Sequence, residues 1–318
     1  MITVEKIDTK DKAQAQRFIN IPYRLYKNHP QWVPPLVMDT KAQMDRDKHP
    51  FYEHSCADFF IASRDGRDVG RVTALENRRF NECHGTHEAQ FYLFECEDDQ
   101  EAANALIEQV CEWARKRGLD HIVGPKGFSS FDGYGILVEG FEHRQMMTMM
   151  NYNYPYYPRL LETIGFTKEV DFVSCYLSAE KFKMPERVYN IARRVIERGT
   201  LQVHRFKTKN DLRAWAQRIG EAYNKTFVNN WEYYPLTERE IKFVLDTLLQ
   251  VADPRLIKII THKEAVVGFL LAFPDVSPAL QRARGHVNPL SCWAFPLKFG
   301  GPNGVPFIGP VSLPDFQG

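Results

Sequence analysis

FFIASRDGRDVGRVTAL, residues 59–75, and IKIITHKEAVVGFLLAF, residues 257–273, follow the same plan. In each, an apolar run leads through a short polar turn into Val-Gly and a second apolar run. Two such runs joined by a tight polar turn are typical of a β-hairpin. Because the pattern occurs in both halves of the chain, it indicates that one structural unit is used twice.

The residues after the first hairpin predict a strand, a helix and a further strand. AQFYLFECE, residues 89–97, predicts the first strand, and DHIVGP, residues 120–125, predicts a short buried one. Between them, DDQEAANALIEQVCEWARKRG has apolar residues at helical spacing, acidic residues at its start and a glycine at its end. We expect a buried helix face formed by Ala102, Leu106, Val110, Trp113 and Ala114.

The second half of the chain follows a predicted linking helix. YPRLLETIGFTKEVDFVSCYLS, residues 157–178, predicts a short helix and then a pair of strands. KMPERVYNIARRVIERGT, residues 183–200, has a proline near its start and a glycine at its end, as helices commonly do. From residue 201 we expect a strand, a helix over 210–227, a helix over 237–252 and the second hairpin.

The composition is that of a globular protein without nucleic-acid or membrane partners. The chain has 318 residues, 44% of them apolar and 25% charged, and its formal net charge is +1. This balance provides no basic stripe for nucleic acid. No run reaches the length of a membrane span, and we read no signal peptide at the start. Six scattered cysteines indicate reduced thiols, so we expect a cytoplasmic protein.

The predicted order of strands and helices resembles the GNAT fold of acyl-CoA-dependent N-acyltransferases. The resemblance rests on the Val-Gly pair of each hairpin, on LLETIGF, which is similar to the family's closing Gly-Phe segment, and on VSLPDFQG at residues 311–318. It implies an α/β fold of two tandem GNAT-like units with mixed central sheets. We expect an N-terminal unit over 1–180, a linking helix over 181–200 and a C-terminal unit over 201–318.

Two further segments, YKNHPQWVPPL and MNYNYPYYPRLLETIGF, resemble a group of uncharacterised bacterial two-unit GNAT proteins. In GNAT enzymes the bulged central strand splays from the next strand, so that pantetheine can pair with its backbone. The amides of a glycine-rich loop at a helix N-terminus hold the pyrophosphate of CoA. A carboxylate or a water chain deprotonates the amine, and a tyrosine often protonates the leaving thiolate. The resemblance therefore implies acetyl-CoA or another acyl-CoA as co-substrate, an amine acceptor and no metal.

The first unit departs from this pattern in its CoA loop. The corresponding stretch, ECEDDQEAAN, contains no glycine and gathers acidic side chains where the pyrophosphate would lie. Two like charges about 4 Å apart repel by on the order of 1 to 4 kcal/mol at surface-like dielectrics. We therefore expect no standard CoA site in this unit. Leu161 stands where the family has its tyrosine, and Tyr157, one turn earlier, is the candidate catalytic substitute.

The second unit is the predicted acyl-CoA site. Its central strand and the start of its loop supply the candidate cofactor-binding residues Val311, Leu313, Gln317 and Gly318. The rest of that loop, with its helix and closing strands, would lie beyond Gly318. We therefore expect a truncated second unit, because a sheet that ended at its central strand would leave an unpaired edge. Turnover by this chain is expected to be impaired.

Two segments of the first unit supply candidate acceptor-binding residues. The glycine-rich stretch GPKGFSSFDGYG contributes Asp132 and Tyr134, and the tyrosine-rich loop after it contributes Asn151, Tyr154 and Tyr156. Aromatic rings interleaved with amides suit an apolar pocket with a few hydrogen-bonding groups. A loop that simply covers the core explains the same residues equally well.

The second unit has a stretch of similar character, NNWEYYPLT, where the resemblance places acceptor-binding residues. It contributes Trp231 and Tyr233, with Glu232 as the candidate catalytic base. A metal site is not expected. Cys83 and its histidine neighbours in ECHGTHE lack a second group of ligands at zinc spacing, which favours a turn between strands.

The sequence thus predicts transfer of an acetyl or other acyl group from acyl-CoA to a small-molecule amine. The second unit would hold the cofactor, and the first would shape the acceptor site. Two alternatives stay open. The same fold also serves non-catalytic binding or scaffold proteins, because fold does not determine function. Paired GNAT units also form aminoacyl-tRNA-dependent ligases, although a net charge of +1 argues against a tRNA-binding surface.

Overall fold

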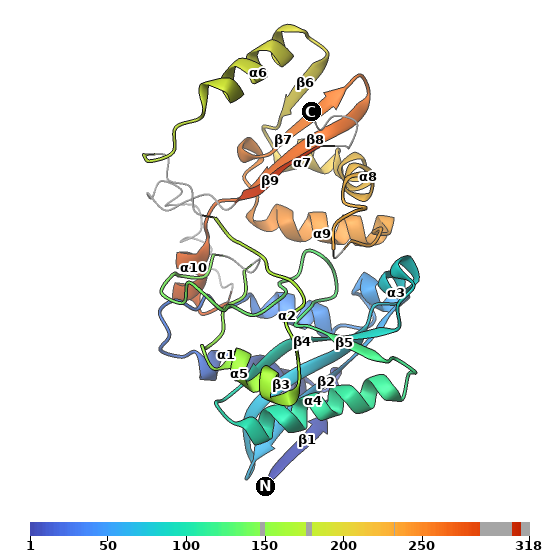
Figure 1. Cartoon of the computed structure of the whole chain (residues 1–318), viewed down its shortest axis with the longest axis vertical. Helices are drawn as coiled ribbons and strands as arrows, with labels where there is room; N and C mark the ends of the chain where they lie inside the picture. Colours follow the sequence, from blue (N-terminus) through green and yellow to red (C-terminus); the bar gives the residue numbers. More distant parts are fainter. Residues whose placement is uncertain (147–149, 176–179, 232, 287–306, 313–318) are drawn as a thin grey trace. The chain divides into compact units, whose positions relative to one another are not determined.

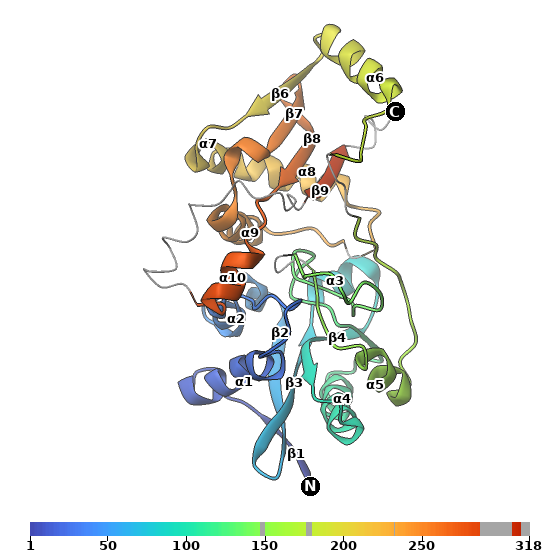
Figure 2. The ribbon, with the colours of Figure 1, turned by 90° about the vertical axis from the view of Figure 1, so that its left-hand side faces the viewer.

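A computed structural model describes residues 1–146, 150–175, 180–231, 233–286 and 307–312. The chain divides into two compact units (Figures 1 and 2). The first consists of Met1–Phe172 together with the segment that starts at Val276. The second contains Val173–Asp275 and the strand Phe307–Ser312. The first unit therefore includes a segment that follows the second hairpin in the sequence.

The first unit is built on one mixed sheet with the strand order β1-β2-β3-β4-β5. Neighbouring strands are antiparallel from β1 to β4, and β4 and β5 are parallel. The strands are β1 (Ile2–Lys6), β2 (Cys56–Arg64), β3 (Arg67–Glu76), β4 (Glu88–Cys96) and β5 (His121–Val123). The helices are α1 (Lys12–Leu25), α2 (Val37–Met44), the 3-10 turn η1 (Pro50–Glu53), α3 (Arg78–His84), α4 (Gln100–Arg115), α5 (Tyr157–Ile164) and α10 (Ser277–Ala283).

The predicted first hairpin is confirmed as β2 and β3. Asp65 and Gly66, the two residues of its turn, both have positive φ, as a tight two-residue turn requires. In the Val-Gly pair, a Cβ atom on Gly70 would lie 2.8 Å from Leu106 Cδ1 and 2.9 Å from the carbonyl oxygen of Glu95. Glycine at this position therefore lets α4 and β4 approach β3 closely.

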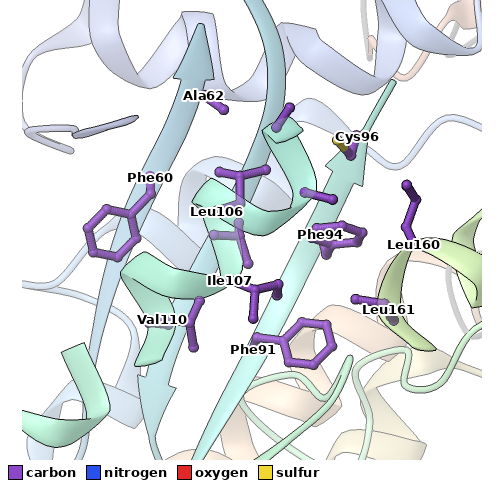
Figure 3. Close-up of a cluster of buried hydrophobic side chains, with 14 of the residues drawn as sticks. Phe60, Ala62, Phe91, Phe94, Cys96, Leu106, Ile107, Val110, Leu160 and Leu161 are labelled. Carbon is purple, nitrogen blue, oxygen red and sulfur yellow. The ribbon is translucent and has the colours of Figure 1, made fainter. Parts of the chain in front are cut away.

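Helix α4 covers one face of the sheet, and its predicted apolar face is confirmed. All five residues of that face are buried: Ala102, Leu106, Val110, Trp113 and Ala114. Figure 3 shows α4 against β2 and β4, with Leu160 and Leu161 of α5 closing the cluster beside Phe94. Burying a large aliphatic side chain contributes roughly 1.5–3 kcal/mol. This apolar layer therefore holds α4 and α5 on the sheet.

Helices α1 and α2 lie on the opposite face (Figure 2). Phe18 and Ile19 of α1 join a buried cluster with Phe59 and Ile61 of β2. Because side chains alternate along a strand, Phe59 and Ile61 point away from the face that α4 covers. The sheet is thus covered by helices on both faces.

Helix α10 is tied to the loop between α1 and α2. The side-chain amide of Gln281 donates to the carbonyl oxygens of Pro30 and Trp32, at 2.8 and 2.9 Å. The carbonyl oxygen of Gly285 accepts from the backbone N–H of Val37 at 3.0 Å. Residues after the second hairpin, which the sequence assigned to the range 201–318, therefore pack within the first unit.

The second unit has a sheet with the strand order β6-β7-β8-β9, in which the pairs of the described strands are antiparallel. The strands are β6 (Leu201–Arg205), β7 (Lys258–His262), β8 (Ala265–Ala272) and β9 (Phe307–Ser312). The helices are α6 (Glu186–Glu197), α7 (Lys209–Arg213), α8 (Ala216–Thr226), α9 (Glu238–Val251) and the 3-10 turn η2 (Pro254–Leu256).

The registers of the two sheets correspond. In both hairpins a bulge lies beside the Val-Gly pair. On their other edge, these strands pair with the next strand of the sheet: Gly70 of β3 pairs with Cys96 of β4, and Gly268 of β8 pairs with Ser312 of β9. A second bulge follows each of these pairs. The predicted fold class is therefore confirmed: the protein is α/β with two GNAT-like units, and the sheet of the first is mixed.

Three predictions of local structure are wrong. Residues 166–175 form no strand; Phe172 and Val173 are exposed and lack the packing that stabilises strand residues. The helix expected over 210–227 is divided into α7 and α8, and Trp215 at the break places its ring against His204 of β6. Cys83 was expected in a turn between strands, but it lies in the last turn of helix α3. This helix is capped by Asn77 and ends at Gly85, which has a positive φ.

Candidate functional site

Strand β5 is short and pairs with residues 88–90 of β4 only. Just after β5, the backbone N–H of Lys126 still donates to the carbonyl oxygen of Phe91 of β4, at 2.8 Å. Leu93 has a positive φ of 50°, and the register with β3 shifts at this point, so β4 is bulged. Beyond the bulge, Glu95 lies opposite Arg71. A bulge in the central strand is a feature that the GNAT resemblance places at the centre of a unit.

Glu95 is the centre of a buried polar cluster. Its Oε2 lies within hydrogen-bond distance of the hydroxyl groups of Tyr157, at 2.8 Å, and Tyr26, at 2.9 Å. Its Oε1 lies 3.9 Å from the guanidinium of Arg71, which also donates to the carbonyl oxygen of Phe18. The side chains of Arg71 and Glu95 are 3% and 15% exposed, so the carboxyl group keeps a limited access to solvent.

Burial determines the titration of this cluster. It raises the pKa of the Glu95 carboxyl above its ordinary value, although Arg71 and the two tyrosine hydroxyls act in the opposite direction. Burial, together with the negative charge of Glu95, also raises the pKa values of Tyr26 and Tyr157. The tyrosines therefore hold their protons at neutral pH, while Glu95 takes up a proton more readily than an exposed glutamate. This combination suits a general base.

Aromatic side chains from two distant segments enclose the cluster. Tyr26 stacks on Trp32 and on Tyr154, with ring centroids 5.1 and 4.9 Å apart. Tyr154 stacks in turn on Tyr156 at 5.4 Å, and its hydroxyl donates to the carbonyl oxygen of Leu25. The segments YKNHPQWVPPL and MNYNYPYYPRLLETIGF therefore meet beside Glu95.

Two tyrosines also close the end of β4. The hydroxyl of Tyr157 accepts from the backbone N–H of Cys96 at 3.1 Å, and the hydroxyl of Tyr156 donates to its carbonyl oxygen at 2.8 Å. Side chains of this unit thus satisfy backbone groups where the resemblance would place pantetheine. Tyr157, predicted to be catalytic, and Tyr154 and Tyr156, predicted to bind substrate, lie together here.

The acidic residues that follow Cys96 are paired with arginines. The pairs are Glu97 with Arg24 and Arg67, Asp98 with Arg159, and Asp99 and Glu101 with Arg64. Asp99 also caps α4 by accepting from the backbone N–H of Ala102 at 3.1 Å. The repulsion expected among these carboxylates is therefore offset by neighbouring cations, which the sequence interpretation had not taken into account.

Asp132 and Asn151 fasten the glycine-rich loop. Asp132 accepts from a backbone N–H three residues before it, at 2.8 Å, and from the side chain of Gln43, at 2.9 Å. Asn151 donates to a backbone carbonyl oxygen of the same loop at 2.7 Å. The ring of Tyr134 contacts the ring of Phe172, with centroids 4.6 Å apart. These contacts hold the loop in shape, and a role in substrate binding stays a prediction.

A second carboxyl group, that of Asp39 in α2, lies within electrostatic range of Asp132. Burial raises the pKa of Asp39 to about 6, and the charge of Asp132 adds to the rise. Burial also raises the pKa of Asp132. Helix α2 therefore brings an ionisable group to this loop that the sequence interpretation did not single out.

The predicted residues of the second unit are only partly within the described chain. Trp231 is partly exposed, and the hydroxyl of Tyr233 donates to the carbonyl oxygen of Asn224 at 2.6 Å. Val311 lies in β9, opposite Phe269. The other candidates lie outside the described residues: Glu232, Leu313, Gln317 and Gly318.

By register, Val311 occupies the position in the second sheet that Glu95 occupies in the first. In the first sheet, Arg71 pairs with Glu95 one position beyond the pair that contains Gly70. In the second sheet, Phe269 pairs with Val311 one position beyond the pair that contains Gly268. An apolar pair therefore replaces the ion pair. The carboxyl group at this position is a property of the first unit.

The sequence interpretation missed Glu95, Tyr26 and Arg71. It grouped Glu95 with the acidic loop, because the bulge that turns this side chain toward Tyr26 leaves no mark in the apolar pattern. Alignment of the two hairpins contained a usable signal, since Arg71 follows Val-Gly where the second half has Phe269. A charged residue inside a buried strand is uncommon without a partner.

Among the described residues, no group of His, Cys, Asp and Glu side chains could hold a metal ion. In the same part of the chain, no helix has the length and apolar character needed to cross a membrane. Five cysteines within it are free thiols: Cys56, Cys83, Cys96, Cys111 and Cys175.

No family model matches the chain. It is similar to a protein named bacterial ceramide synthase from Caulobacter vibrioides strain NA1000 / CB15N, with 29% identity over 289 residues, 91% of this chain and 74% of that protein. It is also similar to Protein YghO from Escherichia coli strain K12, with 25% identity over 285 residues, 89% of this chain and 71% of that protein. A solved tandem GNAT protein from the clavulanic acid biosynthesis pathway aligns with 86% of this chain and 74% of its own, at a TM-score of 0.47 and 12% identity.

Proposed function

We propose that this tandem GNAT-fold chain is an N-acyltransferase that moves an acyl group from acyl-CoA to the amine of a long-chain amino alcohol, with Glu95 as its base. The observation that carries the proposal is the carboxyl of Glu95, buried beyond the β4 bulge with two tyrosine hydroxyls beside it. A carboxyl with a raised pKa is suited to accept a proton near the operating pH.

The relative named bacterial ceramide synthase supports the class of acceptor. A ceramide is the amide of a fatty acid and a long-chain amino alcohol, and the similarity to that protein covers 91% of this chain. Acyl transfer to an amine also agrees with the activity that the GNAT resemblance implies. The finer identity of the acyl group, acetyl or longer, is part of what the experiment below measures.

The proposed reaction begins with the amine as an ammonium ion. The Glu95 carboxylate takes its proton, and the free amine nitrogen attacks the thioester carbonyl carbon. A C–N bond forms, the C–S bond breaks, and the electron pair of that bond leaves with the CoA thiolate. The hydroxyl of Tyr157, 2.8 Å from Glu95, gives a proton to the thiolate and recovers one from Glu95. Glu95, again a carboxylate, then takes the remaining extra proton from the new amide nitrogen and releases it to solvent. The raised pKa of Tyr157 keeps this hydroxyl protonated between turnovers.

An alternative site lies wholly within the second unit. There, Val311, Leu313, Gln317 and Gly318 would contact acyl-CoA, Trp231 and Tyr233 would contact the acceptor, and Glu232 would be the base. Glu95 is preferred as the base because its geometry and raised pKa fit that role. At the corresponding position the second sheet has Val311, which carries no carboxyl group.

The test is amide formation by the full chain. Acetyl-CoA, palmitoyl-CoA or, as a separate donor, aminoacyl-tRNA is combined with amines that range from small primary amines to sphinganine, and the amide is quantified by mass spectrometry. Glu95→Gln should lower kcat/KM by about 10²–10⁴-fold, the usual contribution of a general base. Wild-type kcat/KM should rise with pH, because the base must be ionised. The matched control is Glu97→Gln, which changes a neighbouring carboxylate paired with surface arginines.

Each outcome bears on a different part of the proposal. If Glu95→Gln and Glu97→Gln behave alike while the wild type makes amide, Glu95 is not the base. An absence of amide with every pair, in a chain that folds cooperatively, would favour the non-catalytic binding protein. Product made only from an aminoacyl-tRNA donor would favour the ligase alternative.

A further inference from the structure

Helix α6 has an apolar face that the described part of the chain leaves uncovered. None of its residues is buried, and four of its large apolar side chains are 46% to 70% exposed. They are Val188, Tyr189, Ile191 and Ile196. At 3.6 residues per turn these side chains fall on one side of the helix, and Asn190, Arg193 and Glu197 fall on the other. The helix leads directly into β6 (Figure 1).

The residues just before the helix extend this apolar surface. Phe182 and Met184 are 46% and 51% exposed, and each follows a lysine in the sequence. An uncovered apolar surface of this kind usually marks an interaction site.

Arginines border the apolar face. Arg187, Arg194 and Arg198 are seven and four residues apart, so they share one side of the helix beside the apolar residues. Within the described residues, none of these three side chains makes a hydrogen bond or an ion pair. Arg193, on the polar side, differs: it donates to Asn190 and lies 4.0 Å from Glu197.

Charge is concentrated in this segment. Between Glu180 and Arg198 there are six lysines and arginines and three glutamates, a net charge of +3, whereas the whole chain has +1. The apolar face and the unpaired cations therefore occur on the same short stretch. A partner must accept both at once.

We propose that α6 binds the surface of a membrane that contains anionic lipids. A helix of 12 residues is about 18 Å long, so it lies along the interface rather than across the bilayer. Its apolar side chains would enter the acyl-chain boundary, and the bordering arginines would reach the lipid phosphates. An apolar groove on a protein would accommodate the apolar side chains of α6 but would leave the bordering arginines without partners.

This inference differs from the expectation of no membrane partner, which was based on the absence of a spanning run. It does not depend on the proposed acyl transfer. Surface binding would, however, place the chain where long-chain amines accumulate.

The test is co-sedimentation of the full chain with vesicles of phosphatidylcholine, alone or mixed with phosphatidylglycerol. We expect binding to the mixed vesicles that weakens as NaCl rises, because salt screens the arginines. The variant Arg187→Gln/Arg194→Gln/Arg198→Gln should lower the partition coefficient by on the order of 100-fold, as expected for three surface cations. Ile191→Ser/Ile196→Ser should also lower it. Arg193→Gln, which changes the paired arginine of the polar side, should leave it unchanged.

Three results would overturn the proposal. The first is a folded wild type that binds neither kind of vesicle, and the second is equal binding by the wild type and the triple variant. The third is a serine variant that loses self-association in light scattering, or unfolds at a lower temperature, while vesicle binding stays the same. The apolar face would then contact protein.

Discussion

Removing the carboxyl group of Glu95 should destabilise the first unit. Glu95→Val leaves the guanidinium of Arg71, which is 3% exposed, without the anion that now lies 3.9 Å away. The Nε of Arg71 already lacks a hydrogen-bond partner within the described chain. Removing one partner of a buried ion pair costs about 3–5 kcal/mol, which lowers the unfolding temperature of a unit of this size by about 10 °C.

The second sheet supplies a matched double variant. Phe269 and Val311 stand there in the positions of Arg71 and Glu95, so Arg71→Phe/Glu95→Val installs an apolar pair that the same fold already contains. Replacing both charges of a buried pair by apolar residues is often neutral or stabilising. We expect the double variant to be more stable than Glu95→Val alone, with a coupling free energy of about 2 kcal/mol.

The measurement is urea unfolding of the wild type, the two single variants and the double variant. Hydrogen exchange of the β4 and α4 amides, read by mass spectrometry, reports the first unit separately. The control cycle uses Arg67→Phe and Glu97→Val, a more exposed pair for which coupling of no more than about 1 kcal/mol is expected. Strictly additive free energies at Arg71 and Glu95 would refute the assignment of these residues as an interacting buried pair.

Three further variants test the surroundings of the site. Burial raises the pKa of Asp39 to about 6, so the stability that this carboxyl contributes is present below its unfolded pKa and is lost as pH rises through about 6. Asp39→Asn should therefore flatten the decline in unfolding temperature between acidic and neutral pH. An unchanged decline would contradict this. Gly70→Ala should cost about 1–3 kcal/mol in chemical unfolding, because its Cβ would meet Leu106 Cδ1 and a β4 carbonyl oxygen; a neutral result would mean that these neighbours move aside freely. Asp99→Ala should cost about 0.5–2 kcal/mol and speed exchange in the first turn of α4, because it removes the N-cap. Glu101→Ala, which removes a surface contact to the same arginine and leaves the N-cap in place, is its control, and equal losses in the two variants would argue against the cap.

Much of the fold could be predicted from the sequence because it depends on local patterns. The hairpin over 59–75 is encoded by alternating apolar residues and by Asp65-Gly66, which tolerate positive φ. The buried face of α4 follows from helical spacing, and its ends follow from Asp99 and Gly118. Where local patterns were weak, prediction failed: residues 166–175 have the composition of a strand, but no neighbouring strand covers them.

The candidate site depended on contacts that no local pattern encodes. Tyr157 could be proposed from its place before the Gly-Phe motif, but its partner Glu95 could not. A single bulge at Leu93 decides which face of β4 Glu95 occupies, because side chains alternate and a shift of one residue exchanges the faces.

The sequence by itself determined the repeated unit, the order of its strands and helices, and the segments rich in tyrosine. Only the tertiary structure brought Tyr26, Arg71, Glu95 and Tyr157 together, from four separate elements of the first unit. It also gave Glu95 its raised pKa, since that shift comes from burial by residues distant in the chain. Burial and charge pairing are properties of the packed unit, so a residue that reads as one of several surface acids in the sequence becomes the central ionisable group of the structure.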